Sequence, residues 1–303
     1  MRCLEKEKPR RRRRLSRVGP LASTLPAMNW SNRHVDPAYW LLRLILGLMF
    51  ACHGGQSLSA QEYKDFGKER LNNSPRHGEW VDIKSGDRTI KAFVVYPERK
   101  EKAPVVLVIQ EIFGLTDWLR SMCDELAENG VIAIAPDFLN GQKFEDADSA
   151  SKAVSAVTQD QIKAVLDATA DYALKIPACN GTLAVCGFCR GGGWAFMYAN
   201  TNPKLKATYS FYGQTPGEPS NVANIACPVY GFYGENDERV NATIPKAEEL
   251  MKAAGKKYQP VTYKGAGHGF MRSGEPTNPN VREGDKKARD EAWARWKTLL
   301  KQL

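Results

Sequence analysis

Residues 182–198, TLAVCGFCRGGGWAFMY, join an apolar strand to a helix through a glycine-rich turn. The apolar run up to Cys186 is typical of a buried strand, and Trp194 and Tyr198 have the spacing of a helix that packs on a sheet. Between them, residues 187–191 have the pattern of a nucleophile elbow, with Cys189 in place of the usual serine. The flanking positions of such a turn must be glycine, because a Cβ there would collide with the neighbouring strand or helix. The stretch therefore predicts a cysteine nucleophile on a strand–turn–helix unit.

The rest of the chain predicts more units of the same kind. Continuous apolar runs at 104–109 and 131–135 suit strands that are buried on both faces, and residues 117–129 between them have helical spacing with Gly130 as the C-cap. A hairpin at about 81–96 precedes them. Further strands are expected at 206–212, 228–233 and 258–263, with helices over 162–173 and 244–254 and a closing helix over 292–300. This order predicts an α/β class fold, with a mostly parallel central sheet and helices on both faces.

A cysteine nucleophile needs a base, and the chain offers one candidate. Of the four histidines, His34 and His53 lie in the first 60 residues and His77 lies in a polar arm. His268 is flanked by Gly267 and Gly269, which suits a loop at a strand end better than a packing site in the core. The sequence predicts His268 as the base.

The acid that orients the base is expected between the nucleophile and the histidine along the chain. Asp237 follows the predicted strand 228–233, and Glu235 in the same loop is its rival. We favour Asp237 because it comes later in the loop, where the chain can turn back towards His268.

Five motifs in this order resemble the dienelactone hydrolase family of the α/β-hydrolase superfamily, over about residues 79–303. They read QEIFG at 110–114, APD at 135–137, GFCRGG at 187–192, GEND at 234–237 and GHGFMR at 267–272. The resemblance implies that the cysteine attacks a lactone or ester carbonyl, and that water then hydrolyses the resulting thioester. It also implies that Glu111 holds the resting thiol and helps to activate it, and that Arg272 binds a substrate carboxylate.

Two further features bear on the substrate. The oxyanion hole is expected from the backbone N–H groups of Ile112 and Arg190, on the loop after an earlier strand and on the residue after the nucleophile. Family members that open chlorinated dienelactones also supply an Arg and a Tyr from a segment that corresponds to 139–171, and here that segment contains neither. Lys143 or Lys152 would offer only a point charge. We expect a small and perhaps anionic ester or lactone, and not necessarily a dienelactone.

The net charge of +9 is concentrated at the N-terminus. Residues 1–60 hold eleven Lys/Arg and three Asp/Glu, which leaves 32 basic and 31 acidic residues in 61–303. Nothing there favours a nucleic-acid partner. The basic flank, the apolar run at 44–52 and the small residues at 57–60 predict a signal peptide, with Met28 as a possible true start. The run is too short to span a membrane. We expect 61–78 to be an extended polar arm and the protein to be periplasmic or secreted, with a cytoplasmic enzyme carrying a basic tail as the alternative.

The seven cysteines do not indicate a zinc site, and the five that follow the predicted leader are an odd number, which leaves at least one thiol free. Cys186 and Cys189 have C-x-x-C spacing, but no second pair and only one histidine accompany them in the domain. No motif indicates a cofactor, and we expect a monomer or small homo-oligomer. Two other functions stay open. One is a non-catalytic binding protein that keeps the fold. The other is a redox-active thiol protein in which Cys186 resolves an oxidised Cys189.

Overall fold

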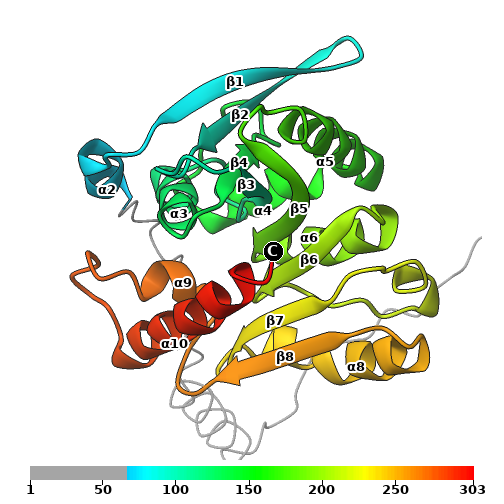
Figure 1. The fold of residues 1–303 in the computed structure, drawn as a ribbon. Helices are drawn as coiled ribbons and strands as arrows, with labels where there is room; N and C mark the ends of the chain where they lie inside the picture. Colours follow the sequence, from blue (N-terminus) through cyan, green and yellow to red (C-terminus); the bar gives the residue numbers. More distant parts are fainter. Residues whose placement is uncertain (1–66) are drawn as a thin grey trace, which may run out of the picture. The chain divides into compact units, whose positions relative to one another are not determined.

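A computed structural model describes residues 67–303, which form an eight-stranded sheet (Figure 1). The strands lie in the order β1-β2-β4-β3-β5-β6-β7-β8. Their bounds are β1 Gly78–Ser85, β2 Arg88–Val95, β3 Ala103–Ile109, β4 Ile132–Pro136, β5 Cys179–Phe188, β6 Leu205–Phe211, β7 Val229–Gly234 and β8 Tyr258–Tyr263. The pairs β1–β2 and β2–β4 are antiparallel, and the other five pairs are parallel. The predicted leading hairpin and mostly parallel sheet are confirmed.

Helices cover both faces of this sheet (Figure 1). Every residue of β3 is buried, with Leu107 packed on one face and Val106 and Val108 on the other. The first face is covered mainly by α5, α6 and α8, and the second by α3 and α10. The helices are α2 Lys68–Asn73, α3 Asp117–Glu128, α4 Ala147–Ser155, α5 Gln159–Ala173, α6 Arg190–Thr201, α7 Glu238–Asn241, α8 Ile244–Ala253, α9 Phe270–Ser273 and α10 Glu283–Leu300, with a 3-10 turn at Pro219–Asn221. This confirms the predicted α/β-hydrolase fold.

Local sequence explains where several helices begin and end. The Thr116 side chain accepts a hydrogen bond from the N–H of Leu119 at the start of α3, and Thr158 forms a capping box with Gln161 at the start of α5. After α3 the chain turns at Gly130, whose φ of +86° suits glycine, as the sequence predicts. Within the polar stretch at 141–157, residues 147–155 form α4, and the Asp146 side chain caps its first turn by accepting a hydrogen bond from the N–H of Ser149.

The prediction of an extended arm is wrong for residues 68–73, which form α2. Leu71 packs against the apolar cluster under α3 and α10, and Arg70 lies 3.6 Å from the carboxylate of Glu125. These contacts with distant residues give a short polar segment a reason to be helical that its own sequence does not show. The predicted leader, its signal peptide and the alternative start at Met28 lie outside the described residues and stay predictions. Within 67–303, no helix is long and apolar enough to cross a membrane.

A buried group of charges ties α10 to α3. Arg289 lies within 2.7 Å of the carboxylates of both Glu125 and Glu275, and its side chain is only 5% exposed. Burial lowers the pKa of the Arg289 guanidinium, but the two carboxylates outweigh burial and raise this pKa. The charge of Arg289 is therefore part of the folded state.

Replacing Arg289 with alanine should lower the free energy of unfolding by about 3–5 kcal/mol, because the two buried carboxylates lose their hydrogen-bonded cation and keep only the more exposed Arg70, at 3.6 and 4.0 Å. Urea unfolding followed by circular dichroism measures the change. Lys286→Ala is the matched control on the same helix. Lys286 pairs with Asp290 at 3.4 Å on the exposed face, so its loss should cost no more than about 1 kcal/mol. Equal losses in the two variants would contradict a structural role for the buried group.

Candidate active site

The turn after β5 holds Cys189 in a strained conformation. The residue has φ +56° and ψ −120° and stands as the N-cap of α6. A Cβ on Gly187 would lie 2.0 Å from the carbonyl oxygen of Gly191, and one on Gly191 would lie 2.4 Å from that of Gln110. These glycines let β5 and α6 approach closely enough to form the sharp turn that carries Cys189, as the sequence predicts. The Cys189 side chain is only partly buried.

Cys189, His268 and Asp237 form one hydrogen-bonded row, although they lie far apart in the sequence. The Nε2 atom of His268 is 3.1 Å from the Sγ of Cys189, and its Nδ1 atom is 2.5 Å from the Oδ2 of Asp237. Asp237 is buried at the end of β7, and His268 lies in the loop after β8. Glu235 instead accepts a hydrogen bond from the N–H of Gly265 at 2.8 Å. The structure therefore places Asp237, and not its rival, against the histidine.

This row strongly favours the charged imidazolium. Burial lowers the pKa of His268, but hydrogen bonds with Asp237 and Cys189, together with the charges of both groups, raise it from 6.5 to about 10. The side chain is 35% exposed, so water screens part of this effect. A protonated His268 can donate one hydrogen bond to Asp237 and another to Cys189.

Glu111 lies behind this row in a buried polar cluster. Its carboxylate accepts a hydrogen bond from the Nε of Arg272 at 2.8 Å and another from the hydroxyl of Tyr212 at 3.2 Å. The guanidinium of Arg272 also lies over the ring of Phe113, 5.3 Å from its centroid. Among the described residues, no hydrogen bond joins Glu111 to Cys189. The Nε of Arg272 therefore donates to Glu111. The Arg272 side chain is 12% exposed.

Tyr212 belongs to the site, and the sequence analysis missed it. The residue follows β6 with φ +40°, is fully buried, and sets its ring edge-on to His268 with the centroids 5.2 Å apart. Burial and then the charge of Glu111 raise the pKa of its hydroxyl well above 10, so it stays a donor. The one available signal was its position, since parallel strands present site residues at their carboxyl ends.

The two residues whose backbone N–H groups are predicted to form the oxyanion hole lie after the ends of β3 and β5. Arg190 is the first residue of α6, and Ile112 follows Glu111 in the loop after β3. Within residues 67–303, neither backbone N–H donates a backbone hydrogen bond. The Arg190 side chain points elsewhere, with its guanidinium 3.3 Å from the Ser155 hydroxyl of α4.

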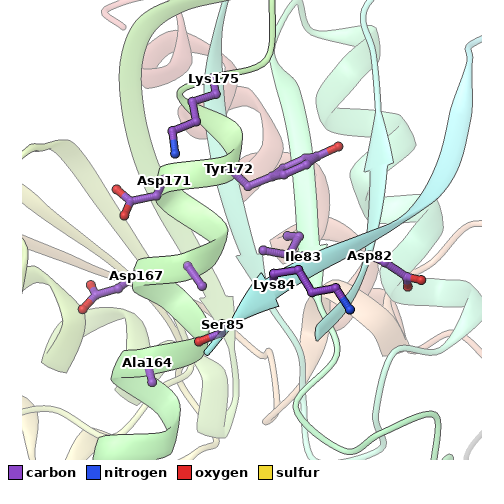
Figure 2. Close-up of a pocket in the computed structure, with 10 residues that line it drawn as sticks. Asp82, Ile83, Lys84, Ser85, Ala164, Asp167, Asp171, Tyr172 and Lys175 are labelled. Atoms are coloured by element: carbon purple, nitrogen blue, oxygen red, sulfur yellow. The ribbon is translucent and has the colours of Figure 1, made fainter. Parts of the chain in front are cut away.

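Two cavities lie away from this row. One of about 500 Å³ lies between β1 and α5, with Asp82, Lys84, Asp171 and Lys175 at its wall (Figure 2). Another of about 320 Å³ lies between the tip of the hairpin, the loop after β4, and helices α4 and α5. Neither lining includes a residue of the row. Across 67–303, no group of three or more His, Cys, Asp or Glu residues is arranged to hold a metal ion.

The cysteines of the described part are all unpaired, at 123, 179, 186, 189 and 227. Cys186 is fully buried in the sheet, and burial raises its pKa well above 9. A buried neutral thiol is a poor partner for disulfide exchange. Its surroundings therefore weigh against the redox function.

Comparison with known proteins agrees with the geometry. The model of the dienelactone hydrolase family matches residues 90–303. A Yersinia pestis protein named "putative carboxymethylenebutenolidase" is 33% identical over 232 residues, which cover 69% of this chain and 85% of that protein. An Escherichia coli K12 protein of the same name is 31% identical over 214 residues, covering 65% and 79%. A solved Klebsiella pneumoniae structure, named "putative dienelactone hydrolase", has a TM-score of 0.68 at 28% identity, and the match covers 75% of this chain and 99% of that one.

The raised pKa of His268 makes stability depend on pH. Because the folded pKa of about 10 exceeds 6.5, the contribution is fully present below pH 6.5 and is lost as the pH rises towards 10. The free energy of unfolding should therefore fall more steeply between pH 7 and 10 in the wild type than in His268→Gln. Urea unfolding across this range measures both slopes, and the exposed His77→Gln variant serves as the control. Parallel curves for the wild type and His268→Gln would contradict the assignment.

Proposed function

Since this chain belongs to the dienelactone hydrolase family, we propose that it is a cysteine-dependent hydrolase of small esters or lactones, acting through a thioester. The observation that carries the proposal is the row in which Cys189, His268 and Asp237 are joined by contacts of 3.1 and 2.5 Å. This arrangement has the three parts that nucleophilic catalysis needs: a nucleophile, a base within hydrogen-bond reach and a group that orients the base. A binding protein has no use for all three.

In the first half of the reaction the Cys189 sulfur bonds to the substrate carbonyl carbon. The oxygen gains negative charge and is stabilised by the N–H groups of Ile112 and Arg190. Collapse of this intermediate breaks the ester C–O bond and leaves a thioester on Cys189. The leaving alkoxide or enolate takes the proton from His268, whose charge Asp237 has stabilised.

In the second half, neutral His268 accepts a proton from water as the water oxygen attacks the thioester carbonyl. The C–S bond then breaks, the acid leaves, and the sulfur again faces a protonated His268. The fold supports this cycle because the nucleophile, the base and the two N–H groups all lie on turns at the carboxyl ends of parallel strands.

The substrate proposed here is small and carries its charge, if any, near Arg272. Residues 139–171 contain no Arg or Tyr, and they form a helical excursion that includes α4. Lys143, one possible substitute, lies 3.7 Å from the carboxylate of Asp117. Recognition of a substrate carboxylate therefore depends mainly on Arg272, whose Nε is already hydrogen-bonded to Glu111.

The first test is hydrolysis of p-nitrophenyl acetate and a set of lactones by the full chain. Cys189→Ala should abolish turnover and the acyl adduct seen by mass spectrometry. His268→Ala should lower kcat/KM by about 10²–10⁴-fold, the usual contribution of a general base. Cys179→Ala, at the opposite end of β5, is the control and should keep its activity. Turnover in Cys189→Ala equal to that of the wild type would refute the proposed nucleophile.

A second test concerns the pair of Arg272 and Glu111. Arg272→Gln should lower kcat/KM even for the neutral p-nitrophenyl acetate by about tenfold or more, because buried Glu111 loses a charge-assisted hydrogen bond. A lactone that carries a carboxylate should lose more, since its own partner is also removed. Arg239→Gln, on α7, controls for loss of one arginine. A loss confined to the carboxylate-bearing lactone would show that Arg272 binds substrate without supporting Glu111.

A further inference from the structure

The segment that carries His268, residues 265–269, is rich in glycine and has few intrinsic restraints on its backbone. Gly265, Gly267 and Gly269 surround the histidine, and two of them have left-handed φ values of +72° and +76°. Glycine backbones have the largest conformational freedom, so a loop of this composition depends on outside contacts to hold one side chain in place. Asp237 orients the ring, but it contacts the ring alone and does not fix the backbone under it.

Asp285, in the first turn of α10, supplies such contacts on both sides of His268. One carboxylate oxygen accepts the N–H of Gly267 at 2.8 Å, and the other accepts the hydroxyl of Ser273 at 3.1 Å. The Ser273 hydroxyl also lies 3.2 Å from the carbonyl of Gly269. The Asp285 side chain therefore holds the backbone directly before His268 by a hydrogen bond. Through Ser273 it also holds the turn directly after the histidine.

The burial of Asp285 is complete, so its charge must be compensated. The carboxylate is 0% exposed and lies 2.6 and 2.7 Å from two nitrogens of Arg282. Asp285 also lies in the first turn of α10, where the helix dipole favours an anion. A buried carboxylate with these partners is a strong acceptor, since hydrogen bonds to a charged group are stronger than neutral ones.

Two glycines allow the backbone of α10 to approach the chain on either side of His268 closely. A Cβ on Gly274 would lie 2.3 Å from the Asp285 carbonyl oxygen, and one on Gly284 would lie 2.4 Å from that of Gly265. One turn further along α10, Arg289 donates to the carbonyl of Met271 at 3.1 Å. The start of α10 thus contacts this part of the chain at several points before and after His268.

We propose that Asp285 is a positioning residue that holds His268 within reach of Cys189, an inference that rests on the proposed hydrolase function. Within residues 67–303, Asp285 makes no hydrogen bond with the three side chains of the row, and it acts through Gly267 and Ser273. Its effect should therefore appear in the chemical step and not in substrate binding.

The test compares three variants of the full chain. Asp285→Ala removes both contacts and should lower kcat for p-nitrophenyl acetate by about 10- to 100-fold with KM within about twofold, because a misplacement of about 1 Å costs up to about 10²-fold. Asp285→Asn keeps an oxygen for the N–H of Gly267 and should recover part of that loss. Leu300→Ala removes a buried side chain at the far end of α10, about 22 Å along the helix from Asp285. It should lower the melting temperature and keep kcat within about twofold.

Two further readouts separate this inference from the proposed function. The rate at which iodoacetamide alkylates Cys189, mapped by mass spectrometry, and the pH at which the His268 ring titrates by NMR both report on the contact between the two side chains. Both should change in Asp285→Ala and stay as in the wild type in Leu300→Ala, even if no ester is turned over. If Asp285→Ala does not fold, Asp285→Asn and Ser273→Ala are measured in its place and should show smaller changes of the same sign. Readouts in the Asp285 variants equal to those of Leu300→Ala would overturn the inference, whether or not the wild type hydrolyses esters.

Discussion

The positive φ of Cys189 is the constraint on which the rest of the site depends. A non-glycine residue in this conformation costs about 1–3 kcal/mol, and it persists because the surroundings allow no other path. The N–H of Cys189 is held by the carbonyl of Phe211 on β6 at 3.0 Å, and the hydroxyl of Ser210 holds the carbonyl of Gly192 at 3.1 Å. The neighbouring strand therefore fixes the turn from one side while the glycine contacts fix it from the other. The backbone of Cys189 is therefore held in its strained conformation from both sides.

The acidic groups around Cys189 all have hydrogen-bond donors beside them. One ring nitrogen of His268 contacts the sulfur of Cys189, and the other contacts the carboxylate of Asp237. These two contacts raise the pKa of His268 to about 10. Glu111 is buried close behind and is neutralised by Arg272, with Tyr212 bridging towards the histidine ring. Each acidic group thus has a donor, which lets several charges share a small, partly buried volume.

Helix α10 serves stability and the site with the same face. Arg289 joins Glu125 and Glu275 in the core, and Asp285, one turn earlier, contacts the loop that carries His268. Residues four apart lie on one side of a helix, so the two anchors act on the same neighbouring segment. The packing that stabilises the fold and the geometry of the proposed base are consequently linked through this helix.

The sequence by itself determined the α/β fold, the turn at Cys189 and the choice of His268, because apolar periodicity, glycine placement and chain order are local or one-dimensional signals. It left Glu235 as a rival to Asp237, offered only the position after a predicted strand as a signal for Tyr212, and gave no sign of Asp285. It also predicted an arm where α2 forms. Only the tertiary structure decided these. Glu111 and Arg272 are 161 positions apart and Tyr212 is 101 from Glu111, so their meeting depends on strand order, register and the path of loops. Those follow from the packing of the whole sheet, which no local pattern encodes.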